Sequence, residues 1–299
     1  MIRVANAPVS WGAIEFADDR GGLAFGQVLD EMQGAGYVGT ELGDWGFLPT
    51  DPETLARELS ARGLSLVGAF VQAALSNPAS HDDGTARALK AARLLAEVAG
   101  EQPFIILSDD NATVEVRTQN AGRIRPEHGL KESRWADLIA GAELISRAVR
   151  DETGLRTTFH HHGGGYIETP AEIEQLLERS NPELLGLCLD TGHFAFGGGD
   201  PAEAIRSFGG RIWHIHLKDF DPTVAARSRE ENWDYLETLR MGVFSELGKG
   251  AVDFPAVFSA LKTIDYDSWV VVEQDLFPGT GTPKESAMRN RTYLRQLGI

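Results

Sequence analysis

Imidazole and carboxylate side chains gather in the second half of the sequence. The chain has eight histidines, and three of them are consecutive in RTTFHHHGGGYIET, residues 156–169. Two more, His214 and His216, lie in the strand-like stretch HIHLKD. Two other strand-like stretches end in a carboxylate, Asp190 in LLGLCLD and Glu273 in SWVVVEQD. Imidazole and carboxylate groups supplied together suit a divalent ion of the Mn, Co, Zn or Fe type.

Side chains alternate between the two faces of a strand, and this divides the histidines into two sets. His160 and His162 share one face, while His161 points to the other. His214 and His216 likewise share a face, with an isoleucine between them. Taking one ligand from each of four consecutive strands predicts a metal site of His160, Asp190, His216 and Glu273.

Each of these residues also has a simpler interpretation. An aspartate at a strand end, such as Asp190, often caps the next helix, and a lone histidine in a strand is often a core residue. Glu273 differs because it follows the apolar run WVVV, where an unpaired buried charge would be costly. The glycines at 163–165 either allow a ligand to approach the backbone or form a flexible turn.

The elements that would carry these residues alternate along the chain. Strands are predicted at 2–6, 37–42, 64–71, 103–108, 155–160, 184–190, 211–217 and 268–274. Helices are predicted at 23–35, 52–62, 83–99, 133–153, 170–179, 201–208, 253–264 and 284–297. Eight alternating pairs favour an α/β fold, a closed parallel (β/α)8 TIM barrel. An open doubly wound sheet is the alternative, but no G-x-G-x-x-G motif follows the first strand.

In such a barrel the active site lies at the carboxyl ends of the strands, where the candidate residues stand. Two long loops, at about 109–132 after strand 4 and 219–252 after strand 7, would follow the strands onto that face. Neither has the composition of a linker. We therefore predict a single domain over residues 1–299.

The composition narrows the classes of function. The net charge of −16 disfavours binding to nucleic acid. The apolar runs are too short to cross a bilayer, and the N-terminus has no signal-peptide pattern, which predicts a cytoplasmic protein without membrane contact. The single cysteine, Cys188, lies in an apolar strand and is expected to be a core residue.

The motifs resemble those of the xylose-isomerase-like TIM-barrel superfamily and, within it, of the inosose dehydratase (2-keto-myo-inositol dehydratase) family. The stretches that carry the resemblance are NAPVSWG, GTELGDWGFLP, HHHGGGYIET, CLDTGHFAFGGGDP, HIHLKD, GVFSELGKGAVDFPAVF and VVVEQD. Together they span most of the chain. The resemblance implies a divalent-metal-dependent lyase of inositol catabolism that dehydrates a cyclic keto-polyol, inosose, to a dione.

The alternative is a metal-dependent sugar isomerase or epimerase, or a related keto-sugar-processing enzyme, on the same barrel. In most isomerases and epimerases of the superfamily strand 5 supplies a glutamate ligand, and here His160 stands in that place. An imidazole bound to a metal through one nitrogen cannot accept a proton there, so the symmetric proton exchange of an epimerase lacks one partner. Elimination is easier to reconcile with this residue. A non-enzymatic sugar-binding barrel is a third class, and it would fail to hold metal.

The chemistry assigns expected roles to further residues. The candidates for proton transfer are Lys218, His193 and Glu273. We expect a lowered pKa for Lys218, or alternatively a surface salt bridge with Asp219. The predicted substrate contacts are Glu41, His162, His214, Gln274, Trp11 and Trp45, with core packing as the alternative for both tryptophans. Mn or Co is the expected cofactor, with Zn, Fe or Mg as alternatives, and a homo-oligomer is compatible with the sequence.

Overall fold

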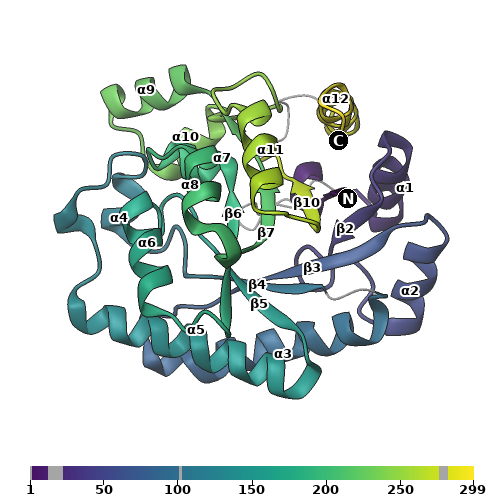
Figure 1. Ribbon diagram of the computed structural model, residues 1–299, viewed down its shortest axis with the longest axis horizontal. Helices are drawn as coiled ribbons and strands as arrows, with labels where there is room; N and C mark the ends of the chain where they lie inside the picture. The colour runs from purple at the N-terminus through teal and green to yellow at the C-terminus, as the bar shows by residue number, and fades with distance from the viewer. Residues whose placement is uncertain (1, 13–22, 101–102, 276–281) are drawn as a thin grey trace.

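Eight parallel strands close into a barrel, as the sequence predicted (Figure 1). The structure is a computed structural model that describes residues 2–12, 23–100, 103–275 and 282–299. The barrel strands are β1 (Arg3–Asn6), β2 (Gly39–Glu41), β3 (Ser65–Gln72), β4 (Phe104–Ser108), β5 (Arg156–His160), β6 (Leu185–Asp190), β7 (Ile212–Leu217) and β10 (Trp269–Val272). Around the barrel the order is β1, β10, β7, β6, β5, β4, β3, β2 and back to β1.

One outer helix returns the chain from each strand to the next, and the last ends the barrel. These helices are α1 (Phe25–Ala35), α2 (Pro52–Ser60), α3 (His81–Val98), α5 (Glu132–Thr153), α6 (Pro170–Arg179), α8 (Pro201–Phe208), α11 (Phe254–Thr263) and α12 (Pro283–Gln296). Every predicted strand and helix has a counterpart whose ends differ from the prediction by at most two residues. The (β/α)8 TIM barrel is therefore confirmed.

Local sequence signals begin several of the outer helices. The Asp51 side chain accepts a hydrogen bond from Thr54 N (2.9 Å) ahead of α2, and a proline follows it at the first helical position. Asp200 does the same for α8, accepting from Ala202 N at 2.8 Å. Such caps satisfy amide groups that the first helical turn leaves without partners. These signals explain why the helix starts were readable from the sequence.

The connections after β4, β6 and β7 contain short elements where the sequence suggested plain loops or turns. They are α4 (Glu115–Gln119), α7 (Thr191–Phe196), β8 (Asp219–Phe220), α9 (Pro222–Glu231), α10 (Tyr235–Arg240) and β9 (Phe244–Ser245). In Figure 1 α4, α9 and α10 lie together beside one end of the barrel. Apolar side chains of these connections form a separate small core that includes Phe196 of α7, Tyr235 of α10 and Phe244 of β9. Elements this short show too few periods for their pattern to be recognised.

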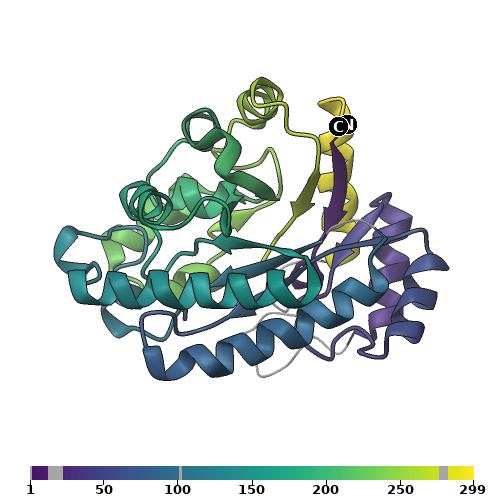
Figure 2. The same ribbon diagram turned by 60° about the horizontal axis from the view of Figure 1, so that its bottom comes forward.

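The main core lies between the barrel and its outer helices. Apolar residues of the strands, such as Ile105 and Leu187, are fully buried against the inner faces of the helices. Figure 2 shows α3 and α5 side by side along one wall of the barrel. Among the described residues no helix combines the length and the apolar character that crossing a membrane would require.

Candidate metal centre and active site

The four predicted metal ligands converge at the carboxyl ends of β5, β6, β7 and β10. One side-chain donor atom of each lies within 4.8 Å of the donor atoms of the other three. Asp190 Oδ2 is 3.6 Å from His160 Nε2, and His216 Nδ1 is 3.2 Å from Glu273 Oε1. Bonds from nitrogen or oxygen to ions such as zinc are about 2.0–2.2 Å long, so donors of one ion lie up to about 4.4 Å apart. The spacing therefore suits a single divalent ion.

Several of these donor atoms make no hydrogen bond to any residue that the structure describes. They are both ring nitrogens of His160, Oδ2 of Asp190 and Nδ1 of His216, all of which are buried. Buried polar atoms are nearly always hydrogen-bonded, so three neighbouring side chains that each bring such an atom to one place need an explanation. A metal ion bound among them would satisfy all of these residues, and the residues present thus fit the cofactor that the sequence predicts.

Asp190 combines the two interpretations that the sequence left open. Its Oδ1 accepts a hydrogen bond from His193 N at 2.8 Å and so caps α7. Its Oδ2 remains free to bind an ion. In the sheet Asp190 lies directly opposite His216 on β7, which places two predicted ligands side by side. One carboxylate can therefore hold the helix end and serve the metal site at the same time.

Lys218 is buried next to the predicted ligands. Its Nζ lies 3.2 Å from Glu273 Oε2, 3.3 Å from Asp275 Oδ2 and 3.8 Å from Asp190 Oδ2. Burial opposes the charged ammonium, but these three carboxylates outweigh it and hold the pKa of Lys218 above its usual value. The expected lowering of this pKa is therefore wrong. A surface pair with Asp219 is also wrong, because the Asp219 carboxylate instead accepts four backbone N–H groups.

Two further imidazoles lie beside the lysine. His193 Nε2 is 3.4 Å from Lys218 Nζ, and the rings of His193 and His162 are 4.0 Å apart between centroids. Burial, followed by the neighbouring positive groups, lowers the pKa of His162 to about 3 and that of His193 well below its usual value. Both rings are therefore neutral near pH 7. A neutral imidazole has one nitrogen that can accept a proton.

The three glycines after the triple histidine are required by close packing. A Cβ atom at Gly163 would lie 2.9 Å from the Tyr235 ring, and one at Gly165 would lie 2.3 Å from Asn111 Oδ1. Gly164 has a positive φ of 75° and would bring a Cβ to 3.0 Å from the same tyrosine. A protein side chain, rather than a ligand, thus approaches the backbone here. No sequence pattern pointed to Tyr235, which lies on the inserted helix α10.

Glu41 and His214 lie deep in the barrel rather than on its rim. Glu41 Oε1 is 2.9 Å from Nε2 of His214 and 2.9 Å from Nε2 of His216. Glu41 is only 2% exposed and His214 is fully buried. Burial alone would raise the pKa of Glu41, but the two imidazoles outweigh it and lower the pKa to about 2. The carboxylate is thus ionised, and its contacts are with histidines.

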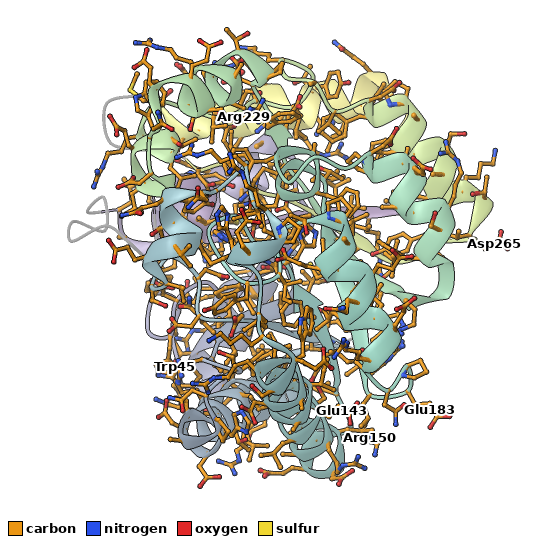
Figure 3. All side chains as sticks on the ribbon, turned by 90° about the vertical axis from the view of Figure 1, so that its left-hand side faces the viewer. Trp45, Glu143, Arg150, Glu183, Arg229 and Asp265 are labelled. Atoms are coloured by element: carbon orange, nitrogen blue, oxygen red, sulfur yellow. The ribbon has the colours of Figure 1, made fainter. Side chains whose placement is uncertain are left out.

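The other predicted substrate contacts lie at three separate places. The Gln274 side-chain oxygen accepts hydrogen bonds from Ser286 Oγ (2.7 Å) and Asn290 Nδ2 (2.9 Å) of α12, on the outside of the barrel. Trp11 is 2% exposed and belongs to the main core. Trp45 is 39% exposed at the edge of the molecule (Figure 3). Trp11 is therefore a core residue, as the alternative interpretation expected. The side chain of Gln274 is hydrogen-bonded to helix α12.

Trp45 nevertheless lines a hollow that extends toward the site. The hollow has a volume of about 270 Å³, and Phe70 and Gln72 at the end of β3 form part of its wall. The Phe70 ring packs edge-on against His160, with 5.9 Å between ring centroids. Lys90 Nζ lies 4.1 Å from the centroid of the Trp45 ring. A substrate contact of Trp45 stays a prediction.

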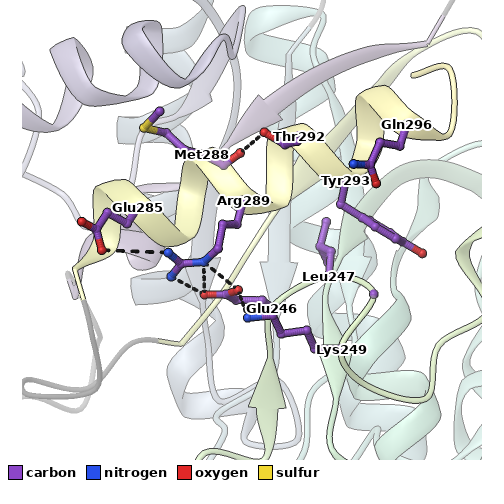
Figure 4. A pocket seen from close by; sticks show the side chains of 10 residues that line it. Glu246, Leu247, Lys249, Glu285, Met288, Arg289, Thr292, Tyr293 and Gln296 are labelled. Atoms are coloured by element: carbon purple, nitrogen blue, oxygen red, sulfur yellow. Dashed lines mark hydrogen bonds and ion pairs between the residues drawn. The ribbon is translucent and has the colours of Figure 1, made fainter.

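A larger groove, of about 510 Å³, lies between α12 and residues 246–249 (Figure 4). Glu246 crosses one end of it, pairing with Arg289 Nη2 at 2.6 Å and with Lys249 Nζ at 2.6 Å. None of the predicted ligands or proton-transfer residues lines this groove. It is therefore a separate feature of the outer surface.

Comparisons with known proteins agree with the fold and the motifs. Residues 29–297 match the family described as xylose isomerase-like TIM barrel. An inosose dehydratase of Geobacillus thermodenitrificans is 33% identical to this chain over 295 residues, covering 99% of this chain and 97% of the relative. The chain belongs to the inosose dehydratase family. The family resemblance drawn from the sequence motifs is thus confirmed.

More distant structures share the fold of this inosose dehydratase family member. The IOLI protein, solved with a binding zinc atom, superposes with a TM-score of 0.72 at 16% identity and covers 99% of this chain and 97% of its own. A 3-keto-D-glucoside 4-epimerase from E. coli gives a TM-score of 0.71 at 15% identity, covering 99% of this chain and 100% of its own. At such identities the likeness shows the fold alone.

Proposed function

We propose that the protein is a divalent-metal-dependent hydro-lyase that dehydrates inosose, a cyclic keto-polyol, to a dione. The observation that carries the proposal is the group of buried donor atoms of His160, Asp190 and His216 that make no hydrogen bond within the described part of the chain, set beside Lys218 and His193. Membership of the inosose dehydratase family and the zinc atom of the IOLI structure support it.

The reaction breaks two bonds in the substrate. A proton leaves the carbon next to the ketone, and the hydroxyl of the following carbon departs. A carbon–carbon double bond forms between those two carbons, and the resulting enol rearranges to the second ketone. The proton and the hydroxide leave together as one water. The enzyme therefore needs one group that accepts a proton and one that donates a proton.

The proposed metal ligands are His160, Asp190, His216 and Glu273, and the two carboxylates among them make the centre suited to a dication. When bound, the ion would polarise the substrate ketone as a Lewis acid. His160 holds a ligand position without offering a second carboxylate as a base. This difference favours elimination over epimerisation at this centre.

Proton transfer is proposed for the residues beside the ligands. Lys218 carries three N–H groups and lies 3.2 Å from Glu273 Oε2 and 3.4 Å from His193 Nε2. An ammonium group suits donation of a proton to the departing hydroxide. His193 and Glu273 suit acceptance of the proton from carbon. His162, whose ring packs against His193, is proposed to contact the substrate hydroxyls.

The test is direct incubation of metal-loaded protein with scyllo-inosose in deuterated water. We expect the ultraviolet absorbance of the dione to rise and no epimerised ketone to accumulate. Protein stripped of metal, the matched control, should form no dione. Epimer appearing without dione would replace the dehydratase by the sugar isomerase or epimerase. Full activity of the stripped protein would refute the metal centre.

The remaining parts of this proposal concern the identity of the ion, the domain organisation of the protein, its location in the cell and its partners. Mn or Co is proposed as the native ion, and Zn, Fe or Mg are the alternatives that metal analysis of purified protein would distinguish. We further propose a single domain, a cytoplasmic location, a homo-oligomer and no nucleic-acid partner. The charge of −16 supports the last of these.

A further inference from the structure

Glu41 joins two histidines through a single oxygen atom. Its Oε1 lies 2.9 Å from Nε2 of His214 and 2.9 Å from Nε2 of His216, and these residues stand on β2 and β7. All three side chains are at most 3% exposed. A buried carboxylate oxygen between two ring nitrogens accepts an N–H from each, because it has no proton to donate when ionised.

These bonds decide which nitrogen of His216 is free. A neutral imidazole carries one N–H and one lone pair, so a ring that donates Nε2–H to Glu41 keeps its lone pair on Nδ1. That nitrogen is the one that lies 3.2 Å from Glu273 Oε1 at the predicted metal centre. The carboxylate thus holds Nε2 of His216 and leaves Nδ1 as the nitrogen that faces the predicted metal centre.

His216 belongs to two groups of side chains that could hold an ion. One is the predicted group of His160, Asp190, His216 and Glu273, and the other consists of Cys188, His214 and His216. The second group lies deeper in the barrel, and all its members are buried. One imidazole cannot complete both groups while one of its nitrogens is bound to Glu41. The nitrogen that Glu41 leaves free, Nδ1, is the one that lies beside Glu273 of the outer group.

We propose that Glu41 is a positioning residue that binds Nε2 of His216 and so presents Nδ1 to the outer group of metal ligands, with His214 as its second anchor. The proposal rests on the metal centre of the proposed function, but not on the identity of the substrate. It gives Glu41 a different role from the direct substrate contact expected from the sequence. Residues that orient a metal ligand in this way change metal affinity by about 10–100-fold when they are replaced.

The test is Glu41→Gln, which keeps the size of the side chain but removes its charge. A neutral amide oxygen in the place of Oε1 is a weaker acceptor for the two ring N–H groups than a carboxylate oxygen. We expect the Kd for Zn²⁺, measured by calorimetric titration of metal-free protein, to rise by about 10–100-fold. The KM for scyllo-inosose at saturating metal should change by less than about twofold, since the residue does not touch the substrate.

Glu246→Gln is the matched control, because Glu246 is paired with Arg289 and Lys249 away from the centre and its loss should leave the Kd for zinc unchanged. An unchanged Kd for Glu41→Gln together with a raised KM would overturn the proposal and return Glu41 to the substrate. If the wild type forms no dione but Glu41→Gln still weakens zinc binding, the proposed function fails while this inference stands.

A second measurement uses the wild-type protein and does not depend on how the variant folds. Co²⁺ bound to a cysteine thiolate has a strong charge-transfer absorption in the near ultraviolet, whereas cobalt bound to imidazole and carboxylate lacks it. We expect no such band when one equivalent of Co²⁺ is added to the metal-free protein. A strong band that disappears in Cys188→Ala would place the ion in the inner group and refute the proposal.

Discussion

Asp190 offers the sharpest test of the metal centre because its two oxygens have separate partners. Oδ1 caps α7 through His193 N at 2.8 Å, and Oδ2 faces the predicted metal centre, 3.6 Å from His160 Nε2. Asp190→Asn keeps an oxygen that can cap the helix but loses the anionic ligand. Asp190→Ala loses both. The two substitutions therefore separate a structural role from metal binding.

The magnitudes follow from the two contacts. Loss of a helix N-cap costs about 1 kcal/mol, which in a protein of this size lowers Tm by roughly 2 °C. Apparent binding energies of four-ligand zinc sites are about 10–16 kcal/mol, or about 3 kcal/mol per ligand, which corresponds to an affinity loss on the order of 100-fold. We expect Asp190→Asn to lose zinc affinity on this scale while it keeps the helix cap. Asp190→Ala should lose both.

The assays are calorimetric zinc titration and urea unfolding of the metal-free proteins. Asp200→Ala is the matched control, since Asp200 caps α8 in the same way, at 2.8 Å from Ala202 N, and lies exposed outside the site. It should lose cap stability and keep its zinc affinity. If Asp190→Asn binds zinc as tightly as the wild type, while Asp190→Ala is merely less stable, Asp190 is a cap alone and the four-ligand centre is refuted.

Three other predictions concern the chemistry, the strand 5 histidines and the response to pH. Lys218→Met should keep its metal content and lower kcat far more than it raises KM; a change confined to KM would contradict a role in proton transfer. His160→Ala should lose metal, His162→Ala should mainly raise KM, and His161→Ala should be mildest; a reversed order would contradict the assigned faces of β5. Burial raises the pKa of Asp109 from 3.8 to about 6. Because the folded-state pKa is the higher one, this residue's stabilising contribution is present below pH 4 and is lost as the pH rises to 6. Urea unfolding of the wild type should therefore show a loss of about 1–3 kcal/mol across this window that is absent in Asp109→Asn; parallel pH profiles would contradict the raised pKa.

The sequence alone determined the barrel fold and the end of the barrel at which the predicted metal ligands lie. Alternating apolar runs and capped helices encode parallel strands, and alternation along β5 separates His160 from His161. A residue at the carboxyl end of a barrel strand stands at the same rim whichever strand carries it. The group of His160, Asp190, His216 and Glu273 could therefore be predicted from strand ends, without knowledge of the side-chain contacts.

Only the tertiary structure decided which side chains are partners. Lys218 pairs with Asp275, 57 residues away, rather than with its neighbour Asp219. Glu41 meets His216 across 175 residues of chain. Side chains from different strands meet inside the closed barrel at separations that no local period encodes, and Tyr235 reaches the glycine loop only because an insertion folds back over the rim. Barrel closure and the packing of the insertions, rather than local sequence patterns, fix these contacts.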